Sequence, residues 1–102
     1  MGKFYVYLLS NQHHTVFYVG FTNDVDRRVR EHKTGFRKSF TKMYNVNKLL
    51  YYEEWASAEE AMHRERQVKK YRREWKENLI NSVNPEWRDL WEDFGRFDRY
   101  GD

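Results

Sequence analysis

Residues 18–32 read YVGFTNDVDRRVREH, an aromatic strand pattern that passes through Gly20 into a helix pattern. At about 100° per residue, four helical positions share one stripe: Val25, Arg28, Val29 and His32. The valines mark this stripe as the inward face, which places the arginine and the histidine at the rim of the core. Burying a charge without a partner is costly, so this placement indicates an anion-binding site.

The segments on either side of this stretch predict a small antiparallel sheet. Residues 4–9, FYVYLL, favour a strand, and a polar turn follows at residues 10–14. Residues 16–21 form the next strand, so the two strands are expected to pair as an antiparallel hairpin. Residues 46–53, with two leucines and two tyrosines at their centre, predict a third strand.

Capping residues mark where three helices are expected to begin: Thr22, Asn23 or Asp24 for the first, Ser57 for the second and Asn84 for the third. The first helix is expected to end near Gly35. Ser57 and Glu60 match a capping box that opens a long helix, and Pro85 suits the first position of the last one. That last helix carries a large apolar stripe: Trp87, Leu90, Trp91 and Phe94.

The predicted element order is ββαβα plus a C-terminal helix. It describes an α+β fold in which helices flank a small three-stranded antiparallel sheet. We expect one domain over residues 1–94 and a disordered tail over residues 95–102. The chain has no cysteine, no apolar run long enough to span a membrane and no signal-peptide pattern, so a cytoplasmic protein is expected.

The long second helix also carries a charge on its inward stripe. Six residues project within about 45° of one direction: Ala61, Glu65, Val68, Arg72, Trp75 and Leu79. Glu65 therefore lies between two apolar positions, unlike the other acids of this helix. One interpretation is an ion pair inside the core with Arg28 or Arg72, and the other is a functional carboxylate.

The body of the chain is basic. Residues 86–102 hold six acids and three arginines, so residues 1–85 carry a charge of +6 within the net +3. Residues 63–76 alone contain seven Lys or Arg and two Glu. Such a charge suits a polyanion such as nucleic acid, although a solvated helix face explains the same run.

Taken together, these residues resemble the GIY-YIG nuclease family. The family's second motif is Tyr18-Val19-Gly20, and its first motif reads Tyr5-Val6-Tyr7, with Tyr7 eleven residues before Tyr18. The family's arginine corresponds to Arg28, ten residues after Tyr18; His32 follows four residues later, and Glu65 resembles the family's metal-binding glutamate.

The resemblance covers roughly residues 3–92. Residues 48–53 and 84–90 resemble the short stand-alone bacterial branch related to the nuclease domain of the excision-repair protein UvrC. The chain departs from the family where Tyr5 replaces the glycine of the first motif. That replacement limits how closely a substrate backbone can approach this strand.

The resemblance implies hydrolysis of phosphodiesters by water with one divalent metal ion. It assigns the metal, Mg²⁺ or Mn²⁺, to Glu65, a hard oxygen ligand, and the scissile phosphate to Arg28. His32 would polarise water or bind the phosphate, Tyr7 would act as general base and Tyr18 would orient the water. Each residue also has a structural alternative: a salt bridge for the arginine, packing for the histidine and core positions for the tyrosines.

A second group of residues is predicted to contact the nucleic-acid backbone: Lys33, Arg37, Lys38, Lys42, Arg66, Lys69 and Lys70. Tyr44, Tyr71 and Trp75 are candidates for stacking on bases, but Trp75 lies on the predicted core stripe, which favours packing. DNA is favoured over RNA as the partner.

The function that we predict from the sequence is a metal-dependent nuclease acting on DNA, in repair or processing. One alternative is a nucleic-acid-binding module of the same fold that cleaves weakly and relies on a protein partner for targeting. Another is a protein-interaction domain, which leaves the complete set of site residues unexplained. The oligomeric state stays open, because the apolar stripe of the last helix can cover the core or a partner.

Overall fold

The computed structural model describes residues 3–34 and 44–94. Along the chain the elements are β1 (Phe4–Ser10), β2 (Phe17–Thr22), α1 (Val25–Lys33), β3 (Lys48–Trp55), α3 (Ala58–Lys69) and α4 (Arg73–Val83). The predicted α+β class with a three-stranded antiparallel sheet is confirmed. The predicted tail at residues 95–102 lies outside the described residues.

The sheet has the order β2-β1-β3, so β1 is central and β2 is an edge strand. In β1, Leu8 pairs with Tyr51 and Leu9 with Leu49, which leaves Leu50 as an extra residue in β3. This bulge places Leu50 and Tyr51 on the same face of the sheet, and both are buried there. It explains why the third strand lacks strict alternation; the strand also begins and ends two residues later than predicted.

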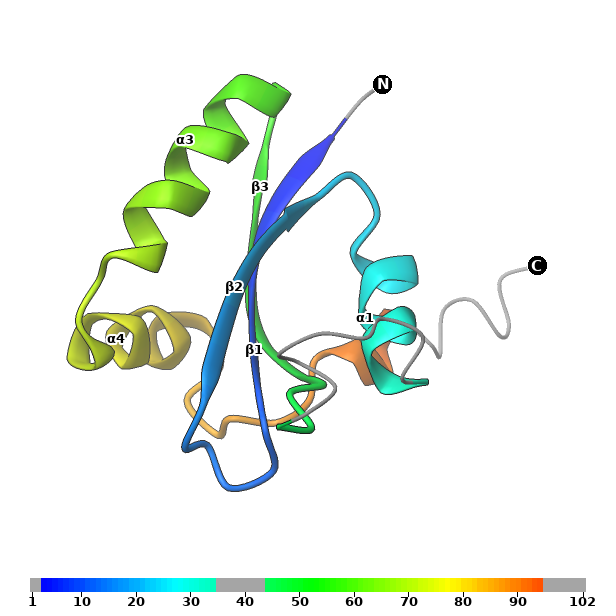
Figure 1. Ribbon diagram of the computed structural model, residues 1–102, viewed down its shortest axis with the longest axis vertical. Helices are drawn as coiled ribbons and strands as arrows, with labels where there is room; N and C mark the ends of the chain where they lie inside the picture. Colours follow the sequence, from blue (N-terminus) through cyan, green and yellow to red (C-terminus); the bar gives the residue numbers. More distant parts are fainter. Residues whose placement is uncertain (1–2, 35–43, 95–102) are drawn as a thin grey trace.

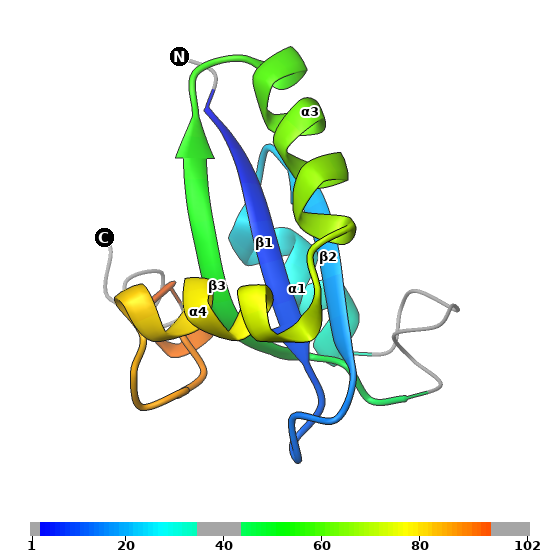
Figure 2. The same cartoon turned by 90° about the vertical axis from the view of Figure 1, so that its left-hand side faces the viewer.

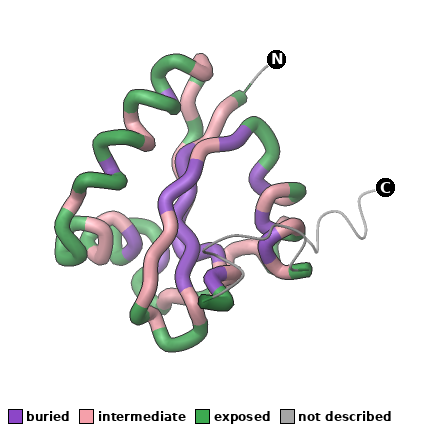
Figure 3. Tube along the Cα trace, in the orientation of Figure 1, coloured by how far each residue is buried: buried purple, intermediate pink, exposed green. Residues whose placement is uncertain are grey.

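The sheet separates two layers (Figure 1). Helices α3 and α4 cover one face of the sheet, and α1 together with residues 90–94 covers the other. Figure 3 shows buried positions following the strands, with exposed positions on the outer sides of the helices. The fully buried side chains are mainly Val, Leu and Ile, and most aromatic residues surround them as half-buried rings.

Helix α1 begins and ends as its sequence predicts. The Asp24 side chain accepts a hydrogen bond from the backbone N–H of Arg27, which caps the N-terminus. At the other end, Thr34 N–H donates to the carbonyl of Arg30. Val25, Val29 and His32 are buried against the sheet, so the inward stripe of this helix is confirmed.

The predicted long second helix is wrong, because the structure has two helices. Helix α3 ends at Lys69, and Arg72 adopts an extended conformation before α4 begins. One helix over residues 58–83 would be about 39 Å long, whereas strands of 6–8 residues span only about 20–26 Å. The break turns α4 across the strands (Figure 2), where it buries Ile80 in the core.

The predicted final helix from Pro85 is also wrong. Asn84 is the C-cap of α4, and Trp87 has a positive φ of 55°, which a right-handed helix cannot contain. The Asn84 amide donates to the carbonyls of Leu50 and Arg88 and so holds an irregular turn against β3. Helical structure is confined to residues 91–94 in the described part of this segment.

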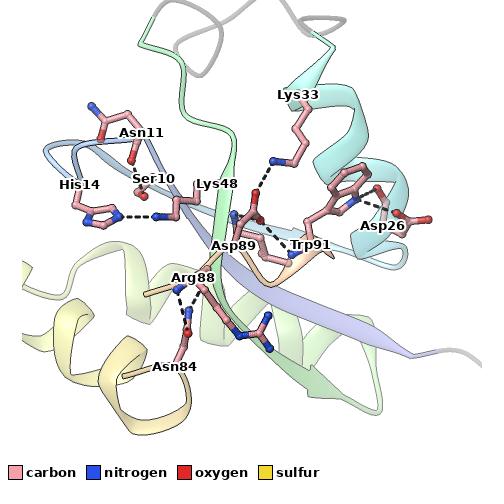
Figure 4. Close-up of polar contacts among 11 residues, drawn as sticks. Ser10, Asn11, His14, Asp26, Lys33, Lys48, Asn84, Arg88, Asp89 and Trp91 are labelled. Atoms are coloured by element: carbon pink, nitrogen blue, oxygen red, sulfur yellow. Dashed lines mark hydrogen bonds and ion pairs between the residues drawn. The ribbon is translucent and has the colours of Figure 1, made fainter. Parts of the chain in front are cut away.

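The predicted apolar stripe of that helix is consequently divided between the two faces of the sheet. Trp87 packs against the α3/α4 face, and Leu90, Trp91 and Phe94 pack against the α1 face. Figure 4 shows the contacts that hold this segment: Asp89 accepts from Lys33, and the Trp91 indole donates to Asp26. In this chain the stripe therefore covers the core.

Candidate active site

The site begins with a close contact between the two central tyrosine motifs. Tyr7 pairs with Gly20 in the β1–β2 register, and its side chain is only 2% exposed. The Tyr7 ring and hydroxyl lie so close to Gly20 that a methyl group there would be 2.4 Å from Cζ. Gly20 is therefore required by the neighbouring ring, because any side chain would displace it.

Three of the predicted site residues form one aromatic cluster on the α1 face. The ring centroids of Tyr7 and Tyr18 are 6.2 Å apart, and those of Tyr18 and His32 are 5.5 Å apart. His32 also lies 6.4 Å from Tyr7 and is 6% exposed. The strand hairpin and helix α1 thus bring these three side chains together.

Arg28 lies one helical turn before His32 on α1, so the two side chains share one face of the helix. Its side chain is 25% exposed, and Nε lies 3.7 Å from a carboxylate oxygen of Glu31. Within residues 3–34 and 44–94, the buried Nε makes no hydrogen bond. The guanidinium therefore keeps hydrogen-bonding capacity for an anion.

Glu65 lies on α3, which packs along β2 and β1, and its side chain is 17% exposed. Its partner in the structure is Lys69, with Nζ 2.8 Å from Oε2. The alternative of a core ion pair with Arg28 or Arg72 does not hold, because the carboxylate pairs with Lys69 and Arg72 is exposed beyond the break after α3.

Lys69 links this carboxylate to the aromatic cluster. The hydrogen bond from Lys69 to Glu65 raises the pKa of the lysine, and a weaker electrostatic interaction with Tyr18 adds to it. Tyr18 lies on an edge strand, so side chains from both layers can meet around its open side. Glu65 and Tyr18 therefore flank one edge of the sheet.

A network that sequence reasoning missed holds α3 against β3. Glu53 accepts hydrogen bonds from Tyr51, Trp55 and Arg64, at 2.5, 2.7 and 2.7 Å. Burial opposes ionisation of Glu53, but these hydrogen bonds outweigh it and hold the pKa of the carboxyl below its usual value. Arg64 directly precedes Glu65, so this anchor helps to set the rotation of α3 that presents Glu65. The alternation of Tyr51, Glu53 and Trp55 on one strand face is the signal that could have revealed the network.

The residues present fit a metal ion that takes most of its ligands from water and phosphate. The described part of the chain holds no group of three or more His, Cys, Asp or Glu side chains suited to enclose a metal. Glu65 offers a single hard oxygen site, and it already holds a cation in the form of the Lys69 ammonium group. Mg²⁺ is typically bound by one or two carboxylates together with water and substrate phosphate.

The predicted nucleic-acid contacts have different surroundings. Lys33 is engaged, with Nζ 2.6 Å from Asp89 and 5.1 Å from the centre of the Trp91 ring (Figure 4). Arg66 is exposed on α3, and Lys70 is exposed at the C-cap of that helix. The Lys69 side chain is 55% exposed. The other three, Arg37, Lys38 and Lys42, lie outside the described residues.

Comparisons with known proteins agree with this geometry. A model of the GIY-YIG catalytic domain matches residues 3–78. The chain therefore belongs to the GIY-YIG family, whose catalytic domain is that of a nuclease. More particularly, it is similar to UPF0213 proteins, a group of short GIY-YIG proteins.

A UPF0213 protein of Haloquadratum walsbyi is 36% identical over 74% of this chain and 83% of its own length. One from Staphylococcus haemolyticus is 34% identical over 78% of this chain and 96% of its own length. The solution NMR structure of a UPF0213 protein from Bacillus halodurans matches with a TM-score of 0.54 and 32% identity, over 86% of this chain and 93% of that one. No helix in the described ranges has the length and hydropathy to cross a membrane.

Proposed function

We propose that this protein is a divalent-metal-dependent endonuclease that hydrolyses phosphodiester bonds in DNA, in cytoplasmic repair or processing of DNA. The observation that carries the proposal is the clustering of Tyr7, Tyr18 and His32 within 6.4 Å between ring centroids. Arg28 extends this cluster on the same helix face, and Glu65 lies at the same sheet edge. Membership of the GIY-YIG family supports the same chemistry.

Arg28 would bind the scissile phosphate. A guanidinium offers a planar fork of donors that matches two phosphate oxygens and stays charged at any working pH. The buried Nε, which makes no hydrogen bond within the described ranges, supports this role. His32, on the next turn, would hydrogen-bond the phosphate or the attacking water.

Tyr7 would accept the proton of the attacking water, and Tyr18 would orient that water. The Tyr7 hydroxyl lies over Gly20, where the neighbouring strand presents no side chain. A phenol is a weak base near neutral pH, so the reaction depends on positive charge close to the transferred proton.

Glu65 would hold the Mg²⁺ or Mn²⁺ ion. When bound, such an ion supplies charge stabilisation for the phosphate and the leaving oxygen. Lys69 neutralises Glu65 in the structure, and it would then be free to contact phosphate. Arg66 on α3 and Lys70 at its C-cap would extend the phosphate contacts. Arg37, Lys38 and Lys42 are proposed as further phosphate contacts, and the engaged Lys33 would have a smaller role.

The test is incubation of the full chain with supercoiled, linear and branched DNA, and with RNA, in the presence of Mg²⁺ or Mn²⁺. We expect nicking of DNA that stops with chelator and falls about a hundredfold or more in Glu65→Ala and Arg28→Ala. Glu59→Ala, an exposed carboxylate on the same helix, is the matched control and should retain activity.

The two alternative functions give different results in the same experiment. A catalytically weak module would bind DNA with a steep salt dependence and leave it intact. A protein-interaction domain would bind without that salt dependence. Equal cleavage by wild type, Glu65→Ala and Arg28→Ala would refute the proposed site.

A further inference from the structure

Trp75 is a surface residue, although its place on the predicted stripe favoured the core. It is 45% exposed on the first turn of α4. The position of α4 that is buried in the core is Ile80. An indole that is almost half exposed loses the hydrophobic stabilisation that burial would provide, so its position calls for an explanation.

The neighbours of Trp75 hold its ring in place at the surface. The Arg72 guanidinium lies 5.0 Å from the centre of the indole, and Tyr71 meets it edge-on at 5.4 Å between centroids. Tyr71 is itself fixed by Arg64, which donates a hydrogen bond to its hydroxyl at 3.1 Å. The exposed ring is therefore backed by an ordered aromatic and cationic frame.

The same turn is strongly basic. Residues 69–76 contain five Lys or Arg and one acid, Glu74. Lys70 and Arg72 are both exposed, and Arg72 lies over the indole. This charge is complementary to a polyanion and opposes the approach of a basic partner.

The basic turn adjoins the candidate active site. Lys69, at its start, is the residue that pairs with Glu65 and interacts with Tyr18. Arg73 lies over the ring of Phe17, the first residue of β2, at 4.5 Å. A strand whose phosphates follow this edge would pass from Tyr18 and Glu65 onto the turn that carries Trp75.

We propose that Trp75 is a stacking platform for an unpaired base of the nucleic acid bound at the candidate active site, with Lys70 and Arg72 holding the adjacent phosphates. Exposed aromatic rings in basic grooves bind single strands by stacking, which tolerates any base sequence. The inference rests on the proposed function for the nature of the ligand, but it concerns binding rather than cleavage.

The test measures binding of a fluorescent oligothymidine and of a duplex of equal length, both in chelator so that no cleavage occurs. Trp75→Ala should weaken binding of the single strand about tenfold and change duplex binding less than twofold. Trp75→Phe keeps a ring and should lose less than Trp75→Ala. Oligothymidine should quench the intrinsic fluorescence of wild type, and the quenching should largely disappear in Trp75→Phe although that variant still binds.

Val83→Ala is the matched control, because Val83 is an exposed apolar residue at the other end of α4. Equal single-strand affinity of wild type and Trp75→Ala would overturn the platform, as would an equal loss on both substrates. If wild type cleaves DNA but Trp75→Ala binds the single strand as tightly as wild type, the platform is rejected and the nuclease proposal stands. Trp75-dependent binding without cleavage would support the platform and reject the nuclease proposal.

Discussion

The ring of Tyr7 on β1 lies against the backbone of Gly20 on β2, its partner in the strand register. The contact joins the first tyrosine motif to the glycine of the second. Position 20 must be glycine because the ring of Tyr7 occupies the space that a side chain there would need. The two motifs are thus one structural unit.

Gly20→Ala should destabilise the fold by about 2 kcal/mol, because its methyl group would overlap the Tyr7 ring in a packed core. A double-mutant cycle with Tyr7→Ala, measured by urea unfolding, tests the cause. In the Tyr7→Ala background the alanine at position 20 should cost much less, since the ring is gone. Additive effects would show that the contact is not the origin of the cost.

Glu53→Gln should cost about 2 kcal/mol of stability at pH 7, because Glu53 accepts three hydrogen bonds, one of them from Arg64. The folded-state pKa of Glu53 lies below the ordinary value of 4.5, so its stabilisation is complete above that pH. It is lost as pH falls through the folded-state pKa. The difference in unfolding free energy between wild type and Glu53→Gln should therefore shrink below pH 4.5, and a constant difference down to pH 3 would contradict the assignment.

Asp89→Ala should destabilise the protein by about 2–3 kcal/mol, because it leaves buried donors unpaired. Asp89 accepts from the backbone N–H groups of Leu49 and Trp91 and from Lys33. Glu86→Ala, at an exposed position of the same segment, is the control. Hydrogen exchange should show faster exchange at Leu49 in Asp89→Ala, and unchanged protection there would refute the role of this contact.

Lys69→Met should increase the affinity for Mn²⁺ about two- to threefold in the absence of nucleic acid. The ammonium group competes for Glu65, and an exposed ion pair of this kind contributes only a few tenths of a kcal/mol. Titration followed by electron paramagnetic resonance of Mn²⁺ measures the change. In a Glu65→Gln background, Lys69→Met should leave the Mn²⁺ affinity unchanged. Weaker Mn²⁺ binding by Lys69→Met alone would argue against competition.

Local patterns predicted most of the fold. Strand-forming residues and helix caps are properties of short segments. The structure confirms the strands and the Ser57 cap, and of the three candidates for the first cap it selects Asp24. The helix break at Lys70 escaped prediction because Arg72 and Trp75 stay in phase with the stripe of α3. The apolar periodicity of the sequence continues through the break, because the break reflects the length of the sheet and not a change in the pattern. Periodicity alone therefore could not place Trp75 outside the core.

The candidate site was predictable only as a set of residues. The family resemblance singled out Tyr7, Tyr18 and His32, and their rings lie together in the structure. Their chemical roles remain predictions. The pairing of Glu53 with Arg64 was not predicted, because it joins a strand to a helix whose rotation the sequence leaves open.

The sequence by itself determined the three strands, the starts of α1 and α3, the basic charge and the candidates for the site, since each depends on residues close together in the chain. Only the tertiary structure decided that α3 carries Glu65 to the β2 edge, that Asp89 holds the last segment against β3 and that Trp75 is exposed. These outcomes depend on where a helix stops and how it rotates against the sheet. Both are decided by packing between distant segments, which local periodicity does not specify.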